Sequence, residues 1–245
     1  MRCAPLTAAS LVVALIFCPT MAVAQDLAIT LSENTSVTAR GVQLFMLVTL
    51  LSLAPGLAMM VTCFPFIVTV LSILRQAIGL QQAPPNMLII SLALFLSYFI
   101  MAPVFEVAWA EGILPLMNND LPLEQAMTRA AEPFRGFMTQ RVDPDTLARI
   151  AGLRPVLTPT ETSGAIPFSQ LLPSFLLSEI ARAFQIGFII YLPFLIIDLV
   201  VATVLMSMGM MMVPPVVVSL PFKLAFFVVA DGWTLISESL VRGYL

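Results

Sequence analysis

The chain contains no histidine, and only 10% of its 245 residues are charged. A soluble domain of this size has roughly 25% charged residues, so the composition indicates a membrane protein. Without histidine, the sequence lacks the commonest general base and the commonest metal ligand. No basic run points to nucleic acid, and no nucleophile motif points to catalysis. We therefore expect a protein that is not an enzyme and that holds no cofactor and no metal.

Cysteine is equally scarce. Cys3 and Cys18 lie near the N-terminus and Cys63 lies in an apolar run, with no CxxC pair. Disulfide, zinc and thiol-redox functions therefore have little support. Residues 1–24 are typical of a secretory signal peptide, because a charged start and an apolar stretch end in "AVA" before Gln25. The alternative is an uncleaved first membrane span, although its apolar core is short for the ~20 residues that a span needs.

Charge placement divides the mature chain more sharply than any linker does. Between residues 41 and 105 the one charged side chain is Arg75, whereas fifteen charged residues lie between 106 and 182. We predict an all-α, membrane-associated protein in which two apolar helical hairpins, at 41–105 and 183–241, flank a helical insert at 106–182. A short periplasmic segment at 25–40 precedes the first hairpin.

Each hairpin is predicted from two apolar runs that reach the ~20 residues needed to cross a bilayer. The first pair, Val42–Leu74 and Asn86–Phe105, is joined by the turn-forming stretch "RQAIGLQQAPPN". The second pair, Ala183–Val213 and Val216–Leu240, is joined by "MGMMMVPP". Four spans after a cleaved signal place both termini and the insert in the periplasm. The basic residues near the two connectors agree with this orientation.

The second connector gathers methionine, and its sealing candidates are Met208, Gly209, Met210, Met211 and Met212. Methionine is unbranched and fills irregular or changing gaps, and glycine lets another backbone approach closely. Pro214 and Pro215 are expected to stop the third apolar helix. An irregular backbone at membrane depth is tolerated where protein buries it or where it lines a cavity. We interpret the connector as a compliant constriction; ordinary gap-filling is the alternative.

Charged residues in or beside the last apolar runs are Glu179, Asp198, Lys223 and Asp231. A carboxylate at the bilayer centre costs roughly 2.5–3.5 kcal/mol, so a partner for Asp198 is expected. A structural ion pair between helices or subunits is favoured over a proton relay, because no second carboxylate lies close in sequence. We expect Asp198 to pair with Lys223, with Asp231 or Glu179 as alternative partners of the lysine.

Several long motifs resemble one family. The stretch "AFQIGFIIYLPFLIIDLVVATVLMSMGMMMVPPVVVSLPFKLAFFVVADGW" is similar to the signature of the FliP family of flagellar export-gate proteins, whose injectisome counterpart is SctR. The segments "LLSLAPGLAMM", "LRQAIGLQQAPPN", "LALFLSYFIMAPV" and "PFRGFM" match the same family in the same order. One departure is "TCFPFI", where family members usually read like "TSFTRI" and Phe66 replaces a basic residue.

The resemblance implies a pore-forming core subunit of the type III export gate in the bacterial inner membrane, at the flagellar basal body. It implies a homopentamer that assembles helically with FliQ and FliR, beside FlhB and FlhA, and that exports unfolded flagellar proteins. The methionine cluster would be a gasket of the closed pore, and the buried charges would lie between subunits. An injectisome gate is the alternative within the family. A small-solute or ion transporter and a scaffold without a conduit are the alternatives outside it.

Overall fold

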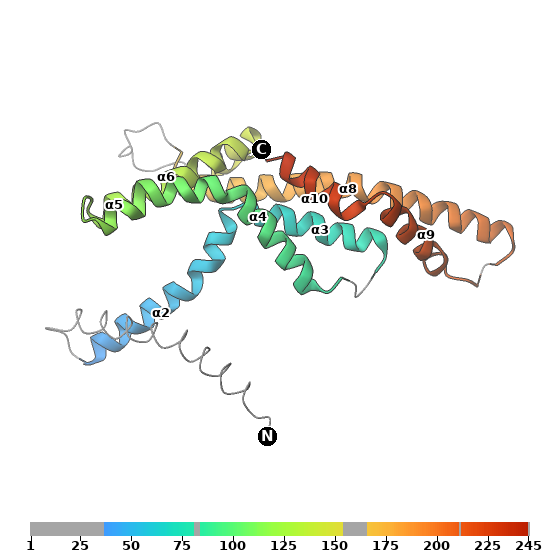
Figure 1. Cartoon of the computed structure of the whole chain (residues 1–245), viewed down its shortest axis with the longest axis horizontal. Coiled ribbons are helices and arrows are strands. Elements are labelled where there is room, and N and C mark those ends of the chain that lie inside the picture. Colours follow the sequence, from blue (N-terminus) through green and yellow to red (C-terminus); the bar gives the residue numbers. More distant parts are fainter. Residues whose placement is uncertain (1–36, 81–83, 154–165, 211, 245) are drawn as a thin grey trace, which may run out of the picture. The chain divides into compact units, whose positions relative to one another are not determined.

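The residues that the computed structural model describes are 37–80, 84–153, 166–210 and 212–244. They are helical almost throughout, and no strand occurs among them (Figure 1). The all-α class predicted from the sequence is therefore confirmed. The predicted signal peptide at 1–24, the start of the segment at 25–40, and Met211 lie outside the described residues.

Helix α2 (Val37–Met60) crosses the boundary between two compact units, residues 1–55 and 56–245. From Arg40 onward this helix is long and apolar enough to cross a membrane. Most of its large apolar side chains are exposed, among them Phe45 and Leu51. A bilayer or a protein partner must cover such a surface, because soluble monomers rarely expose so large an apolar patch.

The first apolar run, Val42–Leu74, does not form one continuous helix. Helix α2 ends at Met60, and a short break precedes α3 (Phe64–Ile78). The predicted run Val42–Leu74 is therefore two helices. Pro65 lies in the first turn of α3, where its missing N–H removes no helical hydrogen bond. Gly79 ends α3 in the left-handed conformation, with φ of 87°, which glycine adopts without a steric cost.

The main core forms around α3, which packs against α4 (Asn86–Ala108) and against α8 (Phe168–Ser207). Ile67, Leu71 and Leu74 of α3 are completely buried. Their spacing of three or four residues places them on one face of the helix. The amphipathic α3 is thus the central element of the unit that begins at Gly56.

Helix α4 continues into a π-helical turn, η1 (Trp109–Ile113), and into α5 (Leu114–Met117). The turn crosses α6 (Leu123–Arg141) closely: a Cβ at Gly112 would lie 2.4 Å from the Cβ of Ala130. Only glycine fits this crossing. Helix α7 (Pro144–Leu153) follows α6 and packs against α8.

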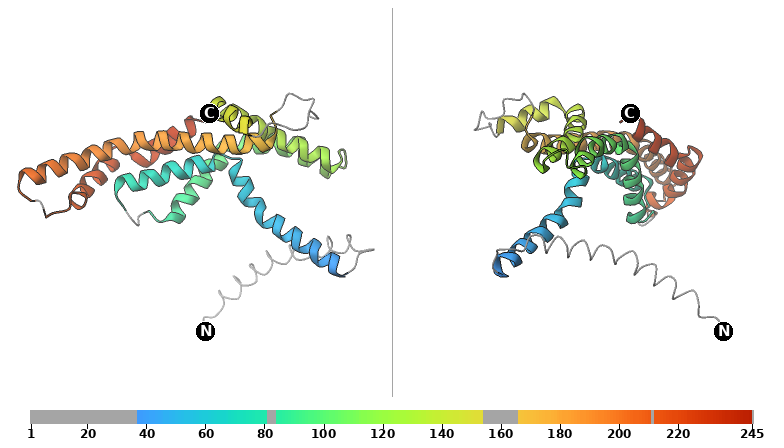
Figure 2. Two further views of the ribbon diagram at one scale, coloured as in Figure 1. Left: turned by 180° about the vertical axis from the view of Figure 1, so that it is seen from behind. Right: turned by 60° about the vertical axis from the view of Figure 1, so that its left-hand side comes forward.

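Helix α8 is 40 residues long and contacts α3, α6, α7 and α9 (Figure 2). It begins fifteen residues before the predicted start at Ala183 and ends six residues before the predicted end at Val213. At Gly187 the approach to α3 is close, since a Cβ there would lie 2.4 Å from Cδ1 of Ile73. The predicted limits of the polar insert, residues 106 and 182, fall inside α4 and α8 and coincide with no helix boundary. The extent of the insert stays a prediction.

The last apolar run forms α9 (Pro215–Val229) and α10 (Gly232–Arg242), which meet at an angle of 60°. Asp231 lies at the bend in the left-handed conformation, with φ of 46°. Within the described part of the chain, three helical stretches are long and apolar enough to cross a membrane: Arg40–Met60, Asn86–Met117 and Phe168–Ser207. The bent pair is a fourth candidate if it counts as one span.

Candidate functional site

The methionine connector is a tight turn whose first half caps α8. Gly209 adopts a φ of 75°. Its N–H donates to the Met206 carbonyl at 3.1 Å, and the Met210 N–H donates to the Leu205 carbonyl at 3.0 Å. These two bonds and the left-handed glycine form a Schellman motif, which satisfies the last carbonyls of a helix.

The two prolines therefore do not stop α8, as the sequence had suggested. Gly209 ends that helix, and the prolines follow several residues later. Pro214 is instead the N-cap residue of α9, and Pro215 is its first residue. Proline is favoured at that place because its fixed φ suits the first turn of a helix.

Methionine side chains project from the turn into open space. Met208 is 66% exposed, Met210 43% and Met212 98%. No atom outside the turn lies within 4 Å of where a Gly209 side chain would begin. The turn is therefore an apolar tip with largely exposed methionine side chains, which suits contact with something outside this chain.

An apolar hollow of about 580 Å³ lies directly behind the tip, between α8 and α9. Met208 and Met210 line its end, and Val200, Val204, Val218 and Phe222 line its walls. The hollow gives the methionines room to change rotamer without breaking other contacts.

Asp198 and Lys223 form an ion pair between α8 and α9, with 2.6 Å between Lys223 Nζ and Asp198 Oδ2. The Ser219 hydroxyl donates to the other carboxylate oxygen at 2.5 Å. Lys223 is 3% exposed, whereas the Asp198 side chain is 30% exposed. The pair ties the two helices together close to the methionine tip.

The same lysine also reaches a third helix. Lys223 Nζ donates to the Ala77 carbonyl of α3 at 3.2 Å. This carbonyl belongs to the last turn of α3, where four carbonyls have no helical partner and where a cation is favourable. Lys223 therefore joins α9, α8 and α3. Asp231, an alternative partner from the sequence, is exposed and accepts a hydrogen bond from Thr234 instead.

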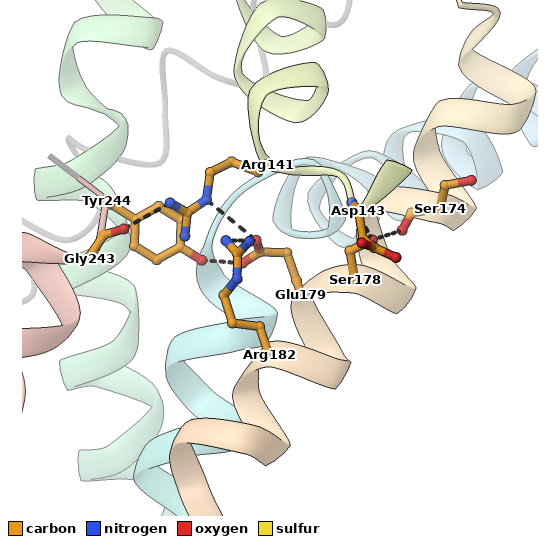
Figure 3. Close-up of polar contacts among 8 residues, drawn as sticks. All are labelled: Arg141, Asp143, Ser174, Ser178, Glu179, Arg182, Gly243 and Tyr244. Atoms are coloured by element: carbon orange, nitrogen blue, oxygen red, sulfur yellow. Dashed lines mark hydrogen bonds and ion pairs between the residues drawn. The ribbon is translucent and has the colours of Figure 1, made fainter. Parts of the chain in front are cut away.

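The second polar cluster surrounds Glu179, which is completely buried (Figure 3). Arg141 Nε and Arg182 Nη1 lie 3.6 and 3.8 Å from Glu179 Oε1, too far for hydrogen bonds. The Tyr244 hydroxyl donates to Glu179 Oε2. Two guanidinium groups therefore face one carboxylate, and the cluster joins the end of α6, the first third of α8 and the residues Gly243 and Tyr244.

Tyr244 is held from several sides. The Arg141 guanidinium lies over its ring at 3.9 Å and donates to the Gly243 carbonyl at 2.8 Å. Phe137 stacks against the ring at 6.2 Å between centroids. Burial, followed by the charge of Glu179, raises the pKa of the Tyr244 hydroxyl far above its usual range. The hydroxyl stays protonated and serves as a permanent donor to the carboxylate.

Three curated relatives, all flagellar biosynthetic proteins FliP, match most of this chain. The protein of Caulobacter vibrioides is 49% identical over 92% of this chain and 85% of its own length. That of Bacillus subtilis is 48% identical over 86% of this chain and 94% of its own length. That of Treponema pallidum is 43% identical over 84% of this chain and 77% of its own length.

The model of the FliP family matches residues 47–240. The chain belongs to the FliP family. The resemblance inferred from the quoted motifs is thereby confirmed, and FliP proteins are a non-enzymatic family of the flagellar export apparatus. Among the described residues, no group of three or more His, Cys, Asp or Glu side chains is placed to hold a metal ion.

Phe66, which stands where the family motif is expected to have a basic residue, is buried against Tyr244. Phe66 is 2% exposed, and its ring meets the Tyr244 ring edge to face at 5.4 Å. An aromatic pair of this geometry contributes about 0.5–1.5 kcal/mol beyond the area that it buries. The phenylalanine thus belongs to the apolar base of the Glu179 cluster.

Sequence reasoning missed Arg141, Tyr244 and Ser219 in these sites. The first two lie far from Glu179 in sequence, and no helical period links them. Ser219 could have been found, because it precedes Lys223 by four residues and shares its helix face. Of the gasket candidates, Met211 lies outside the described residues. The functional roles of the gasket candidates and of the buried charges stay predictions.

Proposed function

We propose that this FliP-family chain is a pore-forming subunit of the flagellar type III export gate in the bacterial inner membrane. Unfolded flagellar proteins would pass through the pore that its copies form. The relatives support a flagellar rather than an injectisome system, because they are named flagellar biosynthetic proteins. The apolar helices support a place in a membrane.

The observation that carries the proposal is the methionine tip. Its exposed side chains are apolar and unbranched, and an apolar hollow lies behind them. Hydrophobic constrictions close a pore by excluding water. A ring of such tips, one from each copy, can close when the pore is empty and can deform around a passing chain. Met208, Met210 and Met212 would form the gasket, together with Met211.

The exposed surface supports assembly from several copies. Phe184, Phe188 and Leu195 are exposed on α8, and Phe95 and Phe99 are exposed on α4. We propose that neighbouring copies, FliQ and FliR cover these faces, and that FlhB and FlhA lie close by. A helical homopentamer uses a heterologous interface, which repeats until another protein caps it. FliR would be that cap.

An ion transporter is a weaker candidate. Asp198 would have to bind and release the coupling ion at the membrane level. It already contacts Lys223 at 2.6 Å and Ser219 at 2.5 Å. A carboxylate with two close donors suits a structural role better than repeated ion exchange.

Deletion of Met210–Met212 tests the gasket. In cells whose export gate contains only the variant, we expect a complex of normal size and an increased leak of small ions. Replacement of the same residues by Leu keeps apolar volume but loses flexibility. That variant should stay sealed at rest and export less flagellin. Met127→Ala is the control, because Met127 is an equally exposed methionine on α6.

Two outcomes would contradict the gasket. The first is an assembled deletion variant whose ion leak equals that of the wild type. The second is a deletion that prevents assembly, which would make the tip a packing element.

Cysteine labelling at position 145 in a Cys63→Ala background tests the orientation of the polar segment. Labelling only after permeabilisation of the inner membrane would contradict its proposed periplasmic location.

A further inference from the structure

A cavity of about 430 Å³ lies between α8 and α10, beside the Glu179 cluster. Its volume falls in the range of roughly 300–1,000 Å³ that is usual for small-molecule sites. Arg141 and Arg182 line one end, together with Gly243 and Tyr244. The remaining walls are mostly apolar and come from Phe66, Ile186, Ile190, Leu235, Ile236 and Leu240, with Ser239 as the one polar residue among them.

The charge at the polar end is positive. Both arginines line the cavity, whereas Glu179 does not. The carboxylate is completely buried beneath them and uses one oxygen on Tyr244. Of the two guanidinium groups, that of Arg182 is the freer, because its side chain is 40% exposed and its one ion pair has a length of 3.8 Å. With five N–H donors on each guanidinium, the cavity offers unused donors to an anion.

The apolar walls extend away from this charged end. Arg182, Ile186 and Ile190 follow one another at intervals of four residues on α8, over roughly 12 Å at the helical rise of 1.5 Å per residue. From Ala183 to the end of α8, the one charged residue is Asp198. The arginine end therefore lies where the polar part of α8 meets its apolar part, which is where a lipid headgroup lies in a bilayer.

We propose that this cavity binds an anionic phospholipid, with its phosphate on Arg182 and Arg141 and an acyl chain along Ile186 and Ile190. A guanidinium binds a phosphate through paired, charge-assisted hydrogen bonds. The apolar walls suit a hydrocarbon chain and offer nothing to a free anion. The lipid would fill the gap between α8 and α10 and would hold the C-terminal residues against the cluster. The site is independent of the pore proposed above.

Lipid rebinding to the detergent-extracted, delipidated full-length protein tests the site. Native mass spectrometry can measure its affinity for phosphatidylglycerol, for phosphatidylcholine and for inorganic phosphate. We expect selective binding of phosphatidylglycerol and no competition by inorganic phosphate. Arg182→Ala should weaken phosphatidylglycerol binding about tenfold, because it removes a charge-assisted contact. Arg129→Ala is the matched control, since Arg129 is exposed on α6 and lies away from the cavity.

A second variant tests the acyl groove without touching either arginine. Ser239 lines the cavity from an exposed position on α10, so Ser239→Trp should fill the groove without removing a core contact. We expect about tenfold weaker binding, and no change for Thr234→Trp, which is exposed on the same helix but does not line the cavity.

Three results would overturn the proposal. One is equal affinity for phosphatidylglycerol and phosphatidylcholine. Another is competition by inorganic phosphate as strong as that by the lipid, which would leave an anion site without an acyl groove. The third is unchanged phosphatidylglycerol affinity in both Arg182→Ala and Ser239→Trp.

Discussion

Substitution of Asp198 and substitution of Lys223 should lower the stability of the protein by different amounts, although the two residues form one ion pair. Lys223 is 3% exposed and would be left with one carbonyl, that of Ala77, if the carboxylate were removed. Asp198 is 30% exposed and would keep the Ser219 hydroxyl if the lysine were removed. Asp198→Leu should therefore destabilise the protein more than Lys223→Met does, although both break the same contact.

The magnitudes follow from the burial of the residue that remains. Removal of one partner from a buried ion pair costs about 3–5 kcal/mol, and we expect about 3 kcal/mol for Asp198→Leu. For Lys223→Met we expect about 1–2 kcal/mol, because the remaining carboxylate is partly exposed and hydrogen-bonded. The double variant should lie within about 1–2 kcal/mol of the wild type, because apolar replacement of a whole buried pair is often neutral.

Thermal unfolding in one mild detergent, followed by tryptophan fluorescence, measures this cycle. For 150–250 residues, 1 kcal/mol shifts Tm by roughly 2–4 °C, so Asp198→Leu should lower Tm by about 6–12 °C. Arg242→Met is the control, because it breaks an exposed pair with Glu238 and should cost at most about 0.5 kcal/mol. Additive single effects, or equal losses for the two single variants, would refute the reasoning. Native gels should also show weaker assembly for Asp198→Leu.

Three further predictions concern single positions. Gly112→Ala should prevent stable folding, because its Cβ would lie 2.7 Å from the backbone of Ala130, whereas Gly136→Ala, with open space around it, should fold normally; size-exclusion chromatography distinguishes them. Gly209→Ala should cost about 1–2 kcal/mol through left-handed strain alone and should lower Tm without aggregation, whereas an unchanged Tm would count against the strain. The Cys63 thiol is completely buried, so its alkylation at pH 8 should be slow in the folded protein and fast in the unfolded protein.

The hydrophobic pattern was sufficient to predict the all-α class and the position of most helices, since each apolar run is helical in the structure, as one helix or as two. It failed where two signals compete. Proline at 214 and 215 suggested the end of α8, but Gly209 ends the helix first, because a left-handed glycine closes a Schellman motif. The start of α8 was missed because its first fifteen residues mix polar and apolar side chains, which reads as part of the polar insert.

The sequence indicated only part of the two candidate sites. The cost of an isolated carboxylate at membrane level was enough to expect a partner for Asp198, and Lys223 is that partner in this structure. Nothing comparable indicated Tyr244 or Arg141 as neighbours of Glu179. Contacts between residues far apart in the chain depend on how the helices pack, and periodicity within one helix carries no information about that packing.

If the methionine turn seals a pore as proposed, it needs a rigid support, which α8 would provide. In the first third of α8, Glu179 is fixed by the tyrosine and two arginines. Nineteen residues later, Asp198 binds Lys223, which also holds α3. Beyond the end of α8, the Met208 and Met212 side chains are 66% and 98% exposed. Because local stability falls with the number of buried contacts, motion should concentrate at the tip. Weakening the Asp198–Lys223 pair would let the support move with the tip, so such variants should both lose stability and leak ions, whereas deletion of Met210–Met212 should cause leak alone.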